Sequence, residues 1–133
     1  MRPTLLDDAA LRRWVGIGLD ALGEARHEID GLNVYPVPDG DTGTNMFLTF
    51  EGAARALDGC PEGDLRSTGT ALARGALLGA RGNSGVILSQ LLRGMAEGLA
   101  HSDESAGGRA VAAAFQRASE LADQAVELSL IHI

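Results

Sequence analysis

Apolar residues recur at alternating steps of four and three positions over 11–29, which is the pattern of an amphipathic helix. Thr4 and Asp7 precede this run with the spacing of a capping box, and Gly31 follows it. The pattern therefore predicts one long helix that begins near Asp7 and ends near Gly31. The next segment, 32–43, contains two prolines and Asp-Gly turn signals, so an extended loop is expected there.

Further apolar stripes follow, separated by short runs rich in glycine, proline and aspartate. The second predicted helix begins near Thr44 and ends before the break at 58–64. The fourth predicted helix has an apolar stripe of Ile87, Leu91, Met95 and Leu99. Polar residues fill the other face of the last predicted helix, whose stripe is Val111, Ala114, Ala118, Leu121 and Ala125. No segment alternates convincingly as a strand, so the sequence predicts an all-α domain. After the first helix, the expected helices cover about 44–57, 65–80, 84–100 and 109–127.

The composition agrees with one packed domain and narrows the range of partners. The chain has 133 residues, of which 45% are hydrophobic, so it has room for one domain at most. Its 11 basic residues face 18 acidic ones, and the net charge of −7 disfavours nucleic acid as a partner. Every basic residue is arginine, so the lysine that a Walker-type phosphate loop requires is missing.

The sequence carries no signal for a membrane or for export. Its longest apolar runs are far shorter than the roughly 20 residues that span a bilayer, so no membrane span is expected. The N-terminal sequence MRPTLLDD lacks the order of charged and apolar residues found in a signal peptide. Cys60 is the single cysteine and cannot form an internal disulfide. The expected location is therefore cytoplasmic.

The last six residues, LSLIHI, break the alanine-rich pattern before them. They match the in-frame translation of a transposase adapter used in sequencing libraries, so we interpret 128–133 as foreign and Glu127 as a truncation point. The domain itself is then 1–127. An ordinary apolar C-terminus is the alternative interpretation.

Two carboxylates stand close together in the first loop, where Asp39 and Asp41 flank Gly40. Mg²⁺ is typically bound by one or two carboxylates together with substrate phosphates, and this sparse set suits it. A calcium EF-hand is excluded because Gly43 and Phe50 stand where that loop needs ligands. The alternative is an Asp-Gly turn with a purely structural role.

The turn before the predicted helix 84–100 offers a second candidate. Gly82, Asn83, Ser84 and Gly85 lie where free backbone amides and the positive helix end favour an anion such as phosphate. Capping of the helix by Asn83 or Ser84 is the structural alternative. A serine hydrolase has little support, because Val86 stands where the nucleophile-elbow pattern requires glycine.

Together these segments resemble a known family. LNVYPVPDGDTGTNM (32–46) and GARGNSGVILSQ (79–90) are similar to the nucleotide-binding kinase domain of dihydroxyacetone kinases, and closest to the ATP-binding subunit of bacterial fatty acid kinase. The resemblance covers residues 1 to about 127. It implies an antiparallel barrel of eight helices, of which this chain supplies about the first five, with ATP held through two Mg²⁺ ions.

The resemblance also implies roles for individual residues. Asp39 and Asp41 would be catalytic and would bind the metal ions, with Asn33 as a further ligand. Asn33 stands roughly where dihydroxyacetone kinases carry an aspartate, one residue further from Asp39 than in those enzymes. For Thr42, Thr44 and Asn45, the alternative role is capping of the second predicted helix. The residues expected to contact the nucleotide are Thr42, Gly43, Thr44, Asn45, Gly82, Asn83, Ser84 and Gly85.

The activity implied by the resemblance is transfer of the γ-phosphoryl group of ATP to a fatty acid carboxylate, giving an acyl phosphate. A separate lipid-carrier protein would present the acid, and the full-length protein could form a homodimer. A glycerone-type kinase acting on dihydroxyacetone and a non-catalytic helical binding module are the alternatives. A barrel without its last three helices would expose an apolar seam, so weak folding and little kinase activity are expected of this chain alone.

Overall fold

The protein folds into a bundle of helices. A computed structural model describes residues 6–32, 40–61, 63–99, 105–106 and 108–131. The elements in chain order are β1 (Leu6–Asp7), α1 (Asp8–Leu32), α2 (Thr42–Asp58), α3 (Leu65–Leu78), α4 (Gly82–Leu99), β2 (Ser105–Ala106) and α5 (Gly108–Ile131). The prediction of an all-α domain with five helices is confirmed for the described residues.

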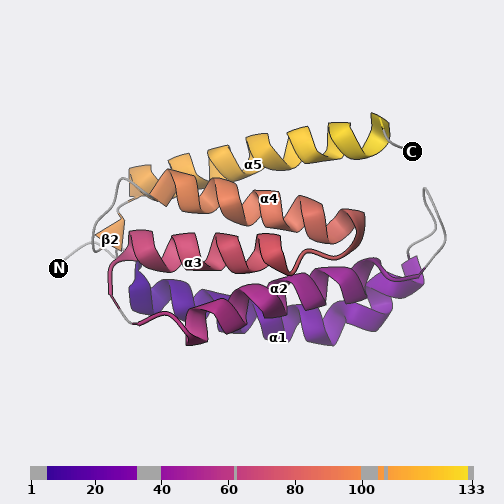
Figure 1. The fold of residues 1–133 in the computed structure, drawn as a ribbon, viewed down its shortest axis with the longest axis horizontal. Helices are drawn as coiled ribbons and strands as arrows, with labels where there is room; N and C mark the ends of the chain where they lie inside the picture. The colour runs from indigo at the N-terminus through magenta and orange to yellow at the C-terminus, as the bar shows by residue number, and fades with distance from the viewer. Residues whose placement is uncertain (1–5, 33–39, 62, 100–104, 107, 132–133) are drawn as a thin grey trace.

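Each helix runs antiparallel to the one before it and packs beside it (Figure 1). The helix α2 also contacts α4, so the helices close around a shared core rather than forming a flat row. The end of α1 and the starts of α2 and α4 therefore lie at the same end of the bundle, to the right in Figure 1. None of the described helices is long and apolar enough to cross a membrane.

The start of α1 follows the sequence prediction. The Asp7 carboxylate accepts a hydrogen bond from the amide of Ala10 at 2.8 Å, which is the bond of an N-cap residue. The other member of the predicted capping box, Thr4, lies outside the described residues. Asp7 also belongs to the short strand β1, which pairs antiparallel with β2. The expectation of no strand is wrong at this one ladder, because two-residue strands are too short to show an alternating pattern.

Helix boundaries differ from the prediction by a few residues. The helices α2 and α4 each begin two residues earlier than expected, at Thr42 and Gly82. The helix α5 extends from Gly108 to Ile131 and so passes the expected end near Glu127. The segment after Glu127 contains no glycine or proline before Ile131, so nothing in it stops the helical backbone. The foreign origin of 128–133 stays a prediction.

The core is built mainly from leucine and alanine. The α5 stripe is confirmed at Ala114, Ala118, Leu121 and Ala125, which are buried, whereas Val111 is half-buried. The α4 stripe differs, because Leu92 is buried with Met95 and Leu99 whereas the predicted Ile87 and Leu91 are only half-buried. The buried face is rotated toward small residues of α4, which let α5 approach closely. The buried core cluster consists of Leu11, Val15, Phe50, Ala53, Leu57, Leu65, Leu72, Ala76, Leu92, Met95, Leu99, Ala114 and Ala118.

A network of charged groups ties the start of α1 to the turn between α2 and α3. The Arg12 guanidinium donates to Asp8 at 3.0 Å and to the carbonyl oxygens of Leu57 and Cys60 at 2.8 and 3.0 Å. Asp8 also accepts a hydrogen bond from the hydroxyl of Thr68 on α3. Burial raises the pKa of Asp8, but the bonds from Thr68 and Arg12 outweigh burial and leave the pKa below its ordinary value.

Replacement of Arg12 by alanine should destabilise this end of the bundle. It removes one donor each from the carbonyl oxygens of Leu57 and Cys60 and from the buried Asp8, which we expect to cost about 2–3 kcal/mol. Urea unfolding of the complete gene product, with hydrogen exchange to locate the loss in α1 and α2, measures the effect. Arg13→Ala is the matched control, since Arg13 is exposed. Equal stability of the two variants would contradict the role of the network.

An apolar cavity of about 140 Å³ lies between α1, α4 and α5. Trp14 and Phe115 line it while remaining 39% and 56% exposed. Trp14 packs edge-on against the buried ring of Phe50, with the ring centres 5.9 Å apart. Large apolar side chains are thus exposed on α1 and α5, the first and last helices of the chain.

Candidate functional site

The described parts of both segments singled out in the sequence lie at one end of the bundle. The start of α2 carries 42–45 and the start of α4 carries 82–85, next to the end of α1 (Figure 1). The Ser84 hydroxyl donates a hydrogen bond to the carbonyl oxygen of Thr42, at 3.2 Å. The structure therefore brings the described members of the two segments together in one junction.

Asp41 is the described member of the predicted metal ligands, whereas Asn33 and Asp39 lie outside the described residues. It occupies the N-cap position of α2, and its carbonyl oxygen accepts the amide hydrogen of Asn45 at 2.8 Å. Its carboxylate makes no capping hydrogen bond. The described residues contain no cluster of three or more side chains that could hold a metal ion.

Asp30, near the end of α1, caps α2 instead. One carboxylate oxygen accepts the Thr44 amide at 2.9 Å, and the other accepts the Thr44 hydroxyl at 2.6 Å. Arg26 donates to the same hydroxyl oxygen at 3.1 Å. The hydrogen bonds from the Thr44 hydroxyl and amide hold the pKa of Asp30 below its ordinary value. Because Thr44 is already engaged, the structure favours the capping role for it over a direct phosphate contact.

The close approach of α1 and α2 depends on the glycine at position 43. Gly43 is buried, and a Cβ atom added there would overlap the carbonyl oxygen of Arg26 and lie 3.0 Å from the Asp30 carboxylate. The Arg26 guanidinium lies 5.3 Å from the centre of the Phe47 ring and so stacks on α2. Gly43 therefore has a structural reason for being glycine, independent of any ligand.

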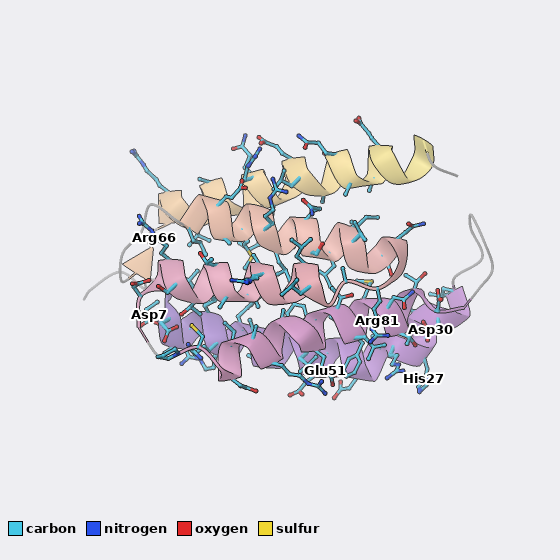
Figure 2. The ribbon with its side chains drawn as sticks, in the orientation of Figure 1. Asp7, His27, Asp30, Glu51, Arg66 and Arg81 are labelled. Carbon is cyan, nitrogen blue, oxygen red and sulfur yellow. The ribbon has the colours of Figure 1, made fainter. Side chains whose placement is uncertain are left out.

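Asp30 and Arg26 were not identified from the sequence as site residues. A carboxylate in the last turn of a helix is unfavourable, because it meets the negative end of the helix dipole. Asp30 occupies such a position on α1, so its placement indicates that it serves another helix. This signal was present in the sequence, but the identity of the second helix is visible only in the folded chain. Figure 2 shows Asp30 and Arg81 at the same end of the molecule.

The first amides of α4 differ from those of α2, where the Thr44 amide already donates a hydrogen bond to Asp30. The amide of Gly85 donates to the Arg81 carbonyl at 3.1 Å and forms the first turn of the helix. The amides of 82–84 precede this bond, and such amides have no acceptor within their own helix. Gly82 has a φ of +66°, in the left-handed region that favours glycine. The N-terminus of α4 is therefore the end that can receive an anion.

Thr49 and Asn45 of α2 pack against the turn at the start of α4. The buried Thr49 hydroxyl donates to the Asn45 carbonyl at 2.7 Å and accepts the Arg81 amide at 3.1 Å. A Cβ atom at Gly85 would overlap the Thr49 hydroxyl oxygen, and one at Gly82 would overlap the Asn45 side chain. Asn45 thus supports the turn from α2. Both glycines are needed for the turn to lie this close.

Replacement of Asp30 by asparagine should loosen the junction without unfolding the bundle. The amide group cannot accept a hydrogen bond on both sides, so the Thr44 hydroxyl loses its acceptor. We expect faster hydrogen exchange over 42–47 and about tenfold weaker binding of ATP with Mg²⁺ to the complete gene product. Asp20→Asn, an exposed position on the same helix, is the control. Unchanged exchange over 42–47 in the Asp30 variant would argue against the capping role.

The lowered pKa of Asp30 also predicts a dependence on pH. A carboxylate with a lowered folded-state pKa stabilises the fold above its unfolded pKa, and the contribution is lost as pH falls through the folded pKa. Protection of 42–47 in the wild-type protein should therefore decline below about pH 4. The Asp30→Asn variant should lack this decline.

Comparison with known proteins finds one matching family model and several similar bacterial proteins. The DAK2 domain model matches residues 36–128. Protein YloV of Bacillus subtilis is 42% identical over 121 residues, which cover 91% of this chain and 22% of that protein. An uncharacterised protein of Staphylococcus aureus strain USA300, SAUSA300_1119, is 45% identical over 98 residues, which cover 74% of this chain and 18% of that protein. The chain thus spans about a fifth of the length of these relatives.

Proposed function

Because the chain belongs to the DAK2 domain family, whose members are kinase-type nucleotide-binding modules, we propose that it is the nucleotide-binding part of a fatty acid kinase. One observation carries the proposal: the start of α2, where Asp41 is the N-cap residue, contacts the start of α4. The hydrogen bond from Ser84 to the Thr42 carbonyl holds the two together at 3.2 Å. An acidic group and a helix end that favours phosphate thus share one junction.

The phosphates of ATP would lie at the start of α4. Its first amides, at 82–84, point out of the helix and carry the positive end of the helix dipole. Gly82 and Gly85 let this turn lie close to α2, and Asn83 is exposed at the same turn. At α2 the amide of Thr44 is bonded to Asp30, so Thr42–Asn45 would position the site more than contact the phosphates.

Asp39 and Asp41 would hold two Mg²⁺ ions, with the carbonyl oxygen of Asn33 as a further ligand. The donor chemistry fits, since carboxylate and amide oxygens are ligands that Mg²⁺ accepts alongside phosphate oxygens. When bound, the ions would neutralise the charge that develops on the transferred phosphoryl group. The helix α2 is capped by the Asp30 carboxylate, and the Asp41 carboxylate makes no capping hydrogen bond.

The proposed reaction is an in-line phosphoryl transfer. A carboxylate oxygen of the fatty acid attacks the γ-phosphorus of ATP, the bond to the bridging oxygen breaks, and ADP leaves with that electron pair. The products are an acyl phosphate and ADP. The amides at the start of α4 orient the phosphate chain, and little covalent work is left for the protein.

The identity of the acceptor rests on the resemblance of 32–46 and 79–90 to the ATP-binding subunit of bacterial fatty acid kinase. A separate lipid-carrier protein would present the acid, in the cytoplasm, to a full-length protein that could act as a homodimer. Residues 1–127 would be the native part of this chain and a partial copy of the domain, with 128–133 of foreign origin.

Calorimetry and a transfer assay on the complete gene product test the proposal. ATP should bind more tightly with Mg²⁺ than with EDTA, and carrier-bound fatty acid should become acyl phosphate. Equal ATP affinity under both conditions would overturn the metal-bridged site. Phosphorylation of dihydroxyacetone, but not of carrier-bound fatty acid, would assign the protein to the glycerone-type kinases. Nucleotide binding without transfer to either acceptor would favour a non-catalytic module.

A further inference from the structure

Charge is distributed very unevenly along the chain. The protein carries 18 acidic residues against 11 arginines, yet all 18 acidic residues lie outside 65–96. That segment contains four of the arginines and comprises α3 and most of α4. Figure 2 shows two of them, Arg66 and Arg81, toward opposite ends of the bundle. The pair of helices α3 and α4 is therefore a basic region in an acidic protein.

A groove of about 310 Å³ runs between the outer faces of α3 and α4. Ala73, Leu77 and Ala96 give it an apolar floor, with Leu77 55% exposed. Arg74 and Arg93, one from each helix, also line it, as does Glu97. An exposed leucine in a groove with two arginines and one carboxylate suits a partner with both apolar and acidic side chains.

The arginines of the groove are only partly neutralised by the chain itself. The Arg74 side chain has no hydrogen bond or ion pair within the part of the chain that the structure describes. Arg93 pairs with Glu97 at 3.2 Å and also donates to Gln90. Glu97 is shared with Arg117 of α5 at 2.7 Å, so one carboxylate serves two guanidinium groups. The groove keeps a net positive charge.

We propose that this groove docks an acidic amphipathic helix of a partner protein. The apolar face of that helix would lie on Leu77 and the neighbouring alanines, and its carboxylates would pair with Arg74 and Arg93. The net charge of −7 and the acidic residues on the other helices would repel nucleic acid and an anionic bilayer. A single helix touches only this local basic surface and avoids that repulsion. The proposal does not depend on nucleotide binding.

A synthetic helical peptide provides the test. The probe is a fluorescein-labelled peptide of about four turns, with leucine at helical spacing on one face and glutamate on both flanks. Binding to the complete gene product is measured by fluorescence anisotropy. We expect binding to weaken about tenfold or more in Arg74→Glu with Arg93→Glu. The control is Arg13→Glu with Arg109→Glu, which changes the net charge equally at exposed positions on α1 and α5.

Two further arms make the result decisive. A peptide with lysine in place of glutamate should bind the doubly reversed groove better than the wild-type groove. Leu77→Ser, which leaves every charge in place, should also weaken binding of the acidic peptide. Circular dichroism checks that each variant keeps its helices.

Three outcomes would overturn the proposal. One is equal loss of peptide binding in the groove variant and the control variant, which would indicate general electrostatics. Another is binding of phosphatidylglycerol vesicles that is lost with Arg74 and Arg93, which would assign the groove to a membrane. The third is self-association that depends on the same residues in sedimentation experiments, which would assign it to a second copy of this chain.

Discussion

Replacing Asp39 and Asp41 by asparagine is expected to weaken binding of ATP with Mg²⁺ to the complete gene product by about 100-fold or more. Both substitutions remove a negative charge that the proposed metal site requires, while the side chains keep nearly the same volume. Asparagine is as good an N-cap residue as aspartate, so the start of α2 at position 41 should keep its conformation. The double substitution should therefore weaken binding of the metal and ATP while leaving the fold intact.

Isothermal titration calorimetry with and without Mg²⁺ measures this effect. The wild-type protein should lose most of its affinity in EDTA, whereas the double variant should bind ATP equally weakly under both conditions. Asp58→Asn with Asp123→Asn is the matched control, since it removes two charges at exposed positions on α2 and α5. Full Mg²⁺ dependence in the double variant would show that other residues hold the metal.

Replacing Gly98 by alanine is expected to separate α4 from α5 and to destabilise the protein by about 3 kcal/mol. A Cβ atom at this position would overlap the Cα of Ala114 and lie 2.6 Å from the Ala114 amide nitrogen. The obstacle is the backbone of α5, so no change of side-chain rotamer can relieve it. Gly94 meets the backbone at Ala118 in the same way one turn earlier.

The sign of this effect separates packing from helix propensity. Alanine stabilises a helix by about 0.5–1 kcal/mol relative to glycine, so propensity alone predicts a gain. Gly16→Ala on α1 is the control, because nothing lies within 4 Å of the added Cβ atom there. It should show that gain, while Gly98→Ala should accelerate hydrogen exchange in α4 and α5. A stabilised Gly98 variant would contradict the close helix contact.

The sequence predicted the five helices well because their signals are local. Four of the five stripe residues predicted for α5 are buried, and the fifth, Val111, is half-buried. In α4 the prediction ranked large apolar residues as the buried ones and so chose Ile87 and Leu91. The structure instead buries Gly94 and Ser89 beside Leu92. Close packing of two backbones selects small residues, and hydropathy does not register them.

The two candidate segments were also identified from the sequence, since they combine turn residues with groups that bind metal and phosphate. The sequence did not show which residues of these segments cap a helix and which can contact a ligand. Asp30 is 14 positions before Thr44, and its bonds to that residue exist only because α1 and α2 turn back on each other. Because of these contacts, Thr44 supports the site rather than binding phosphate, and the start of α4 is the end that can receive an anion.

The sequence by itself determined the helices, the breaks between them and the family, because helix periodicity, capping and turn formation depend on residues a few positions apart. The tertiary structure decided which residues of different helices contact one another. Asp30 caps a helix other than its own, Gly98 admits the backbone of α5, and Arg74 and Arg93 come to face one groove from separate helices. Each depends on the distance between segments remote in the chain, and that distance is set only when the apolar faces pack together.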